Sequence, residues 1–416
     1  MRFLKSFLPC FLFTIMPLMA QSSYHTGVIN STIKSLRVLA NGNSLSIPVI
    51  ELNSDEYIQL SFDVLQHESG QYLYSIIHCD ENWEPSILSS IEYMDGFQNL
   101  PLNDYAISQA TTTSYANYQL LLPNADIHFN VSGNYVVQVR SDNNPDEVLC
   151  NACFSVVEPL VQIEGQISTN TDVDLNQTHQ QLSFSINHRG ISIPNPAADL
   201  KVTVIQNGRT DNQICNLSPS QINSNQFIYD HKRELIFDAG NEYRRFEFLS
   251  HRYNGMHVER TSFHEPYYHI ELQTDLLRSN RTYHYDQDQN GRYIVNSSGA
   301  NDPTLEADYY IVHFTLPIEP MLDSDIFILG ELFNNRLDES SKMQYNFDLK
   351  CYTKDVLLKQ GLYNYQYLVR PHGQKEALTR PIEGDYFETE NEYLIMVYYR
   401  PMGERYDHLI GILNIK

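Results

Sequence analysis

Short runs of alternating, β-branched and aromatic residues recur along almost the whole of this 416-residue chain. Such runs are typical of strands that bury one face, and the turn residues between them, such as Asn41-Gly42 and Asn207-Gly208, are typical of tight connections. Helical periodicity is weak, and the best short candidate for a helix is 355–359. The chain is therefore predicted to be mostly β. The predicted strands are 57–65, 72–78, 118–122, 134–140, 153–157, 181–187, 201–206, 234–237, 244–249, 309–316, 325–329, 363–370 and 393–399.

Two clusters of strand-breaking residues divide these runs into blocks. Pro159 follows the strand-like Val156-Val157-Glu158, and proline cannot continue a hydrogen-bonded ladder. The second break is the stretch 299–303, Gly-Ala-Asn-Asp-Pro. We therefore expect three consecutive immunoglobulin-like β-sandwich domains at 21–158, 160–300 and 305–416, each near the usual domain size of ~100–150 residues.

The N-terminus reads as a secretory signal peptide. Arg2 and Lys5 precede the apolar run 7–19, and Ala20 provides a small residue before Gln21. The run is shorter than the ~20 residues that a membrane-spanning helix needs, and no other segment approaches that length. A buried N-terminal helix is the alternative, but no amphipathic period follows. We expect residues 1–20 to be removed near Ala20 and the rest to be exported without a membrane span.

The charge balance narrows the choice of partner. Without Arg2 and Lys5, 26 basic residues face 51 acidic ones, a net charge of −25. Nucleic acid and anionic lipid surfaces would repel such a chain, so neither is expected as a partner, and a basic protein surface is favoured.

Cysteine is sparse, and five cysteines remain after residue 20. Cys150 and Cys153 form one C-x-x-C pair, but the βαβ setting of a thioredoxin-type site is missing, and so is the second ligand pair of a zinc site. In an oxidising compartment a local Cys150–Cys153 disulfide, or one bond to Cys79, stays open.

Two further clusters contain residue types that can bind metals. Asp286, Asp288, Asn290 and Gly291 match the start of a calcium-binding loop, but Ser297 stands where a bidentate glutamate belongs, so a β-hairpin is favoured. Four histidines lack the spacing of a rigid metal site: His251, His257, His264 and His269. No nucleophile elbow occurs, although a glycosidase carboxylate pair far apart in sequence stays an alternative. We expect no enzyme, cofactor, metal or small-molecule substrate.

The C-terminal block resembles the early-set immunoglobulin-like sandwiches that accompany or bind α-glucans. It carries Gly330, Phe333-Asn334 and then a Gly-x-Tyr-x-Tyr-x-Tyr run from Gly361. In those modules an aromatic residue shortly after Phe-Asn stacks on the sugar, whereas this chain has Asn335-Arg336. A scaffold role is favoured, and a periplasmic or surface glycan-binding protein is the alternative.

Taken in order along the chain, short segments of all three blocks resemble one family, the plug proteins of the type IX secretion system of Bacteroidetes. These segments are 72–80 with Trp83, 92–97, 122–124, 132–135, 239–247, 288–292, 307–310 and 358–361.

The resemblance implies a non-enzymatic function. Members of this family are periplasmic, lie against the inner face of the outer membrane, and cover the mouth of a very large translocon β-barrel while no cargo occupies it. The barrel is then the expected partner.

Residues that would contact this partner are not marked by any motif. Trp83 is the only tryptophan and lies in a polar loop, and Tyr267 and Tyr268 are adjacent aromatic residues. Aromatic side chains are enriched at interface centres, so all three are candidates, with packing onto their own domain as the alternative.

Overall fold

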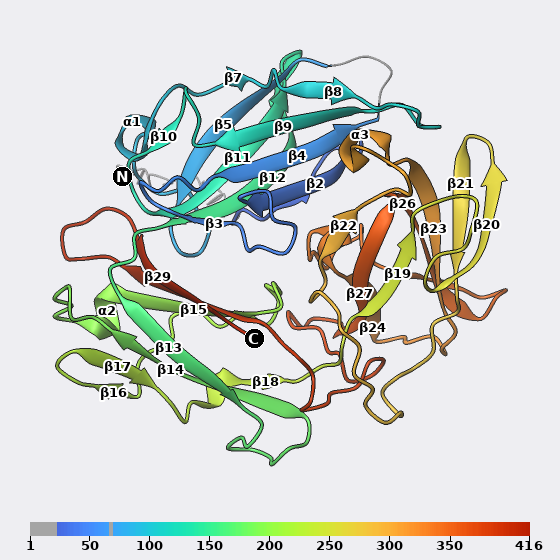
Figure 1. Ribbon diagram of the computed structural model, residues 1–416. Coiled ribbons are helices and arrows are strands. Elements are labelled where there is room, and N and C mark those ends of the chain that lie inside the picture. The colour runs from blue at the N-terminus through green and yellow to red at the C-terminus, as the bar shows by residue number, and fades with distance from the viewer. Residues whose placement is uncertain (1–22, 66–69) are drawn as a thin grey trace, which may run out of the picture.

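The structure, a computed structural model, describes residues 23–65 and 70–416. The signal peptide expected at 1–20 lies outside these residues. Strands dominate the described chain, most of them in antiparallel sheets, which confirms a mostly β, sandwich-like fold (Figure 1). The short helices are α1 (Ser90–Tyr93), α2 (Pro196–Asp199), α3 (Pro303–Glu306), and the 3₁₀ turns η1 (Arg233–Leu235) and η2 (Glu331–Phe333). None of the helices in 23–65 and 70–416 has the length and apolarity to cross a bilayer.

The first core lies between two sheets. Alternation along β5 shows why these residues form it: Tyr72, Tyr74 and Ile76 point into the core, and the residues between them do not. One sheet has the order β1 (Gly27–Val28), β12 (Asn144–Val157), β11 (Gly133–Ser141), β5 (Tyr72–Cys79), β7 (Leu100–Pro101), with β3 (Val49–Glu51) beside β12. The other has the order β2 (Ile33–Ala40), β4 (Ile58–Val64), β9 (Ala116–Leu122), β8 (Tyr105–Ile107); β6 (Met94–Asp95) and β10 (His128–Phe129) form a small pair near α1.

The second core is built from two distant parts of the chain. Its first sheet comprises β13 (Gln162–Ser168), β14 (His179–Asn187), β17 (Gln226–Tyr229), β16 (Gln221–Ile222) and β18 (Ile236–Asp238). Its second sheet comprises β15 (Leu200–Gln206), β28 (Tyr393–Tyr399) and β29 (His408–Ile415). β28 pairs with β15 over seven positions, and Ile395 and Val397 are fully buried in this core. In Figure 1 the red C-terminal strand therefore lies among green ones.

The third core occupies the chain between these two parts. One sheet joins β19 (Arg244–Phe248), β27 (Gly361–Pro371), β22 (Tyr293–Val295) and β24 (Ser324–Leu329). The other has the order β20 (Val258–His264), β21 (Tyr267–Leu272), β23 (Tyr309–Leu316), β26 (Cys351–Lys359), β25 (Gln344–Asn346). Tyr363, Tyr365 and Tyr367 of β27 are buried in it, so the Gly-x-Tyr-x-Tyr-x-Tyr run packs a core.

The sheets do not follow the break expected at 299–303. Strands on both sides of it, β22 and β27, pair with each other, and β15 pairs with β28 across an even longer separation. The expected blocks 160–300 and 305–416 thus contribute strands to the same sheets. Glycine and proline residues mark where a strand ends, but the pairing of strands that are distant in sequence depends on which apolar faces pack together.

Candidate functional site

Trp83 lies in the turn after β5, with a positive φ of 64°. Its backbone N–H donates to the carbonyl of Asp80 at 3.0 Å, and its carbonyl accepts from the N–H of Tyr24 at 3.0 Å. The half-buried indole packs on Cys79 and Cys153, on the face of the sheet turned away from the first core. Trp83 therefore covers its own sheet, and its role as a partner anchor stays a prediction.

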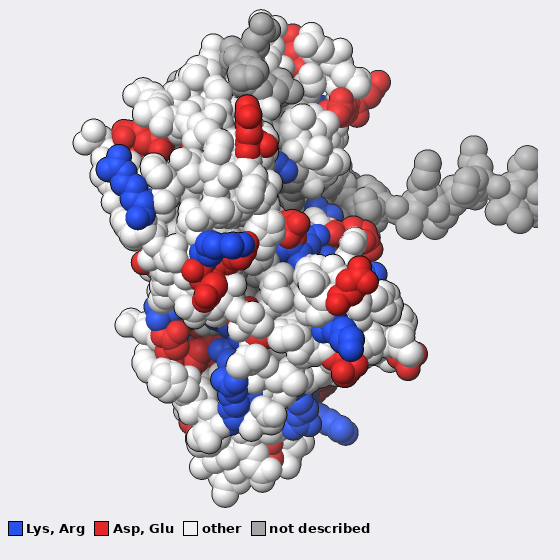
Figure 2. Space-filling model, turned by 90° about the vertical axis from the view of Figure 1, so that its right-hand side faces the viewer, with Lys and Arg blue, Asp and Glu red and all other residues white. Residues whose placement is uncertain are grey.

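Tyr267 and Tyr268 begin β21, at the edge of the third core. The Tyr268 ring packs against those of His251, Phe263 and Tyr310, with centroids 5.0, 4.9 and 5.0 Å away. Figure 1 places the β20–β21 hairpin opposite α1, so the structure does not bring these tyrosines together with the loop of Trp83. Figure 2 views the side of the molecule that carries this hairpin. Acidic and basic side chains are interspersed there, and neither charge dominates the surface.

Cys150 and Cys153 are free thiols, as are the other cysteines of the described residues. Three positions apart on β12, their side chains point to opposite faces of the sheet: Cys150 into the first core, Cys153 toward Trp83. Burial raises the pKa of each to about 12. The local disulfide left open by the sequence is therefore not formed, and neither thiol has the lowered pKa of a redox nucleophile.

The residues that resemble a calcium loop hold the fold together instead. Asp286 pairs with Arg245, and Asp288 accepts the backbone N–H of Asn290 at 2.7 Å. The predicted hairpin does not form there, because β22 pairs with β27 rather than with the residues before Asn290. No group of three or more His, Cys, Asp or Glu side chains in 23–65 and 70–416 is arranged to hold a metal.

A buried ion pair that the sequence did not reveal joins the first and third cores. The Nζ of Lys359 lies 2.6 Å from Oδ2 of Asp63, and these side chains are only 2% and 1% exposed. The Tyr309 hydroxyl donates to the same carboxylate at 2.6 Å, and Asn117 donates to its other oxygen at 2.7 Å. Burial lowers the pKa of Lys359, but the Asp63 carboxylate opposes that effect. Breaking such a pair on one side leaves an uncompensated buried charge.

A second polar junction joins the first and second cores. The buried Asp407 carboxylate lies 3.0 Å from Lys201 and 2.8 Å from Arg400. These cations also reach the first core: Lys201 contacts Glu81 at 2.6 Å and Arg400 contacts Asp80 at 2.9 Å. Burial raises the pKa of Glu81. Burial opposes ionisation of Asp407 as well, but its hydrogen bonds hold its pKa below the ordinary value.

The loop after Phe333 is a third contact with the first core. Asn334 donates to the carbonyl of Leu36 at 3.2 Å, and Arg336 donates to that of Val28 at 3.4 Å. Where a glucan-binding relative would stack an aromatic side chain on sugar, this chain uses the loop to hold its own first core.

These junctions link three β-sandwich-like cores, and this defines a class: a mostly β protein whose sandwich-like cores are joined by polar contacts. The sequence profile described as "Type 9 secretion system plug protein 1st domain" matches residues 33–158, the region of the first core. The chain belongs to the type IX secretion system plug family. The proteins of this family are non-catalytic components of that system.

A solved structure extends the comparison beyond this domain. A hypothetical protein from Parabacteroides merdae ATCC 43184 is 54% identical, with a TM-score of 0.94 over 95% of this chain and 100% of that one. Its arrangement of cores is thus nearly that of the present chain. No curated protein matches.

Proposed function

We propose that this protein covers the periplasmic mouth of the outer-membrane translocon barrel of the type IX system while no cargo occupies it. The observation that carries the proposal is the plug-family match over the first core. Family membership also supports a periplasmic position against the inner face of the outer membrane. The proposed mechanism is mutually exclusive occupancy of the pore, with no bond made or broken.

The joints between the cores suit such a cover. A barrel wide enough for folded cargo leaks unless its idle state is closed by a body that keeps its shape. Here each joint is a desolvated or semi-buried polar network: Asp63–Lys359 on one side and the pairs around Asp407 on the other. Since these networks need fixed geometry, they resist relative motion of the cores.

The glycan-binding alternative is weaker on the same structure. It requires a free loop after Phe333, and Asn334 and Arg336 use that loop for contacts inside the molecule. Directly after Asn334 the sequence has Asn335-Arg336 rather than an aromatic residue that could stack on sugar.

The proposal is tested by recovering the tagged full chain from detergent-solubilised outer membranes of its own host. We expect one very large barrel protein to co-purify, and to be lost when a cargo protein is trapped in the pore. Mass spectrometry of the bound fraction, with and without trapped cargo, reads out both states. A chain that recovers no barrel in mild detergent, or recovers it equally well with cargo in place, would contradict the plug function.

A further inference from the structure

Four large apolar side chains are exposed on two segments that contact each other through Arg405: Ile87, Ile91, Phe97 and Met402, with exposed fractions of 72, 79, 79 and 98%. We call them the α1 platform. Ile91 lies in α1 of the first core, Ile87 and Phe97 lie shortly before and after that helix, and Met402 lies in the loop between β28 and β29 of the second core. Both segments project on the same side in Figure 1. Single exposed apolar residues are ordinary in soluble proteins, but a group of this size indicates an interaction site.

The base of the platform is fixed by hydrogen bonds. The Ser89 backbone N–H donates to the Glu92 carboxylate at 2.8 Å in a capping box that holds α1. The Tyr93 hydroxyl donates to the carbonyl of Ile76 at 2.8 Å, and the Gln98 amide donates to the same carbonyl at 2.8 Å. The exposed side chains of Ile91 and Phe97 are thus carried on backbone anchored to strand β5.

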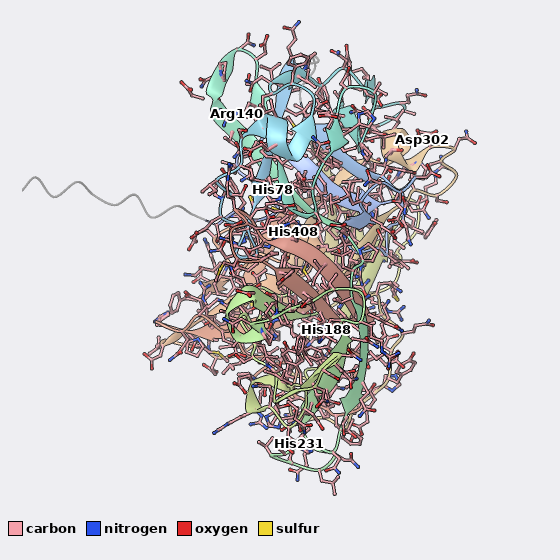
Figure 3. The ribbon with its side chains drawn as sticks, turned by 90° about the vertical axis from the view of Figure 1, so that its left-hand side faces the viewer. His78, Arg140, His188, His231, Asp302 and His408 are labelled. Carbon is pink, nitrogen blue, oxygen red and sulfur yellow. The ribbon has the colours of Figure 1, made fainter. Side chains whose placement is uncertain are left out.

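Arg405 ties the two segments of the platform together. Its guanidinium lies 3.0 Å from the Glu92 carboxylate and donates to the carbonyl of Ile87 at 3.4 Å. Arg400 and Asp407, 2.8 Å apart, close the base of the loop that carries Met402. Figure 3 views this side of the molecule, with His78 and His408 at the junction below α1. Apolar groups that are held in place before binding lose little conformational entropy when a partner covers them.

The charges around the platform are mainly negative. The charges of Glu92 and Arg405 cancel in their ion pair, which leaves the exposed carboxylates of Asp95 and Glu404. A partner that fits this surface presents apolar side chains with lysine or arginine beside them, because buried apolar contact supplies affinity and opposite charge supplies orientation and rate.

We propose that the α1 platform is the surface through which this protein docks on such an apolar and basic protein rim. The inference rests on the proposed function, in which that rim belongs to the periplasmic mouth of the translocon barrel. The platform includes residues of the matched plug domain and joins the first and second cores, so docking there would hold both against the pore. A second exposed group, Leu322, Phe347 and Leu349 in the third core, lies outside the matched domain and provides the control.

The test uses full-length chains with Ile91→Asp, Phe97→Asp or Met402→Asp, and Phe347→Asp as the matched control. All four positions are exposed, so circular dichroism and thermal melting should match the wild type. Recovery of the barrel, or its affinity in detergent, should fall about ten-fold or more for each platform variant, as expected at an interface hot spot. The Phe347→Asp variant should bind like the wild type.

A charge-reversal variant tests whether the protein surface that binds the α1 platform is basic. Glu404→Lys should weaken recovery of the barrel and reduce its sensitivity to salt, since it removes an attraction to a basic rim. Stronger recovery of the barrel by Glu404→Lys would contradict the inference that the partner surface is basic.

The outcomes separate the two proposals. Wild-type chains that recover no barrel contradict the plug function itself. Wild-type and platform variants that recover it equally, or a loss confined to Phe347→Asp, leave the plug function standing and overturn the platform.

Discussion

The hydrogen-bond partners of the buried His78 ring favour its neutral form. It is 1% exposed; its Nδ1 lies 2.8 Å from the Ser86 hydroxyl oxygen and its Nε2 3.2 Å from the Ser132 carbonyl. A neutral ring with its proton on Nε2 donates to that carbonyl and accepts from the hydroxyl. Burial lowers the pKa of His78 to about 4, although the Ser132 carbonyl opposes the shift.

This lowered pKa predicts a loss of stability in acid. The unfolded chain binds a proton near pH 6.5, but the folded chain does so only near pH 4, so protons favour unfolding as the pH falls through that window. Between pH 7 and 4.5 the wild type should lose about 2 kcal/mol more of its free energy of unfolding than His78→Gln. Urea unfolding at both pH values measures this, and equal losses in the two proteins would contradict the assignment.

The buried Asp63–Lys359 pair should contribute measurably to the free energy of unfolding. Lys359→Met leaves the Asp63 carboxylate buried without its cation and should cost roughly 3–5 kcal/mol in urea unfolding. The matched control is Lys342→Met, whose pair with Asp325 is partly exposed, at 29% and 26%. That change should cost about 1 kcal/mol or less. Similar costs for the two variants would show that the buried pair is not what joins the cores.

At the scale of the element, strands were predictable wherever alternation and burial coincide. The predicted runs 309–316 and 393–399 are β23 and β28 with the same bounds. The helix expected at 355–359 is wrong, because these residues belong to β26. Leu357, Leu358 and Lys359 followed by Gly361 favour a helix locally, but eight paired positions with β23 override that preference.

The candidate site was less predictable than the strands, for a physical reason. Trp83 is conspicuous in the sequence because it is the only tryptophan, whereas the exposure of Ile91 and Phe97 depends on how the chain folds around them. The contact of Arg405 with Glu92 spans 313 positions. No local pattern marks either feature, so the platform could be recognised only in the structure.

The closure of the second core by β28 can be tested by hydrogen exchange. Ile395→Ala removes a fully buried side chain between β15 and β29 and should cost roughly 2–5 kcal/mol. Exchange should rise in β15, almost 200 residues earlier in sequence, and stay unchanged in β4 of the first core. Ile222→Ala, at a position 59% exposed, is the control and should change neither strand. An unaltered β15 in the Ile395 variant would contradict the pairing.

Polar junctions at Asp63–Lys359 and around Asp407 help to link the three cores. Asp407 is central to one of them, since it contacts both Lys201 and Arg400. Without that carboxylate, Lys201 and Arg400 keep their pairs with Glu81 and Asp80 of the first core but lose the group that fixes their positions in the second core. The cores should then move and melt more independently.

Calorimetry can detect this uncoupling. We expect one main thermal transition for the wild type and two resolved transitions for Asp407→Ala, because the carboxylate that anchors this junction in the second core is lost. Arg260→Met, which removes an exposed pair with Glu271 within the third core, should keep the wild-type profile. A single unsplit transition in Asp407→Ala would show that the remaining contacts couple the cores without this carboxylate.

The pairing of β15 with β28 also determines the order in which the three cores can form during synthesis. A ribosome delivers Leu200–Gln206 long before Tyr393–Tyr399, so β15 waits without its neighbour while the whole third core is being made. The first core can close early, the third next, and the second only when the chain beyond Tyr393 has emerged. A waiting strand with an unpaired edge invites capture by chaperones or by another chain. Synthesis of this protein therefore carries its greatest aggregation risk in the interval that the third core takes to appear.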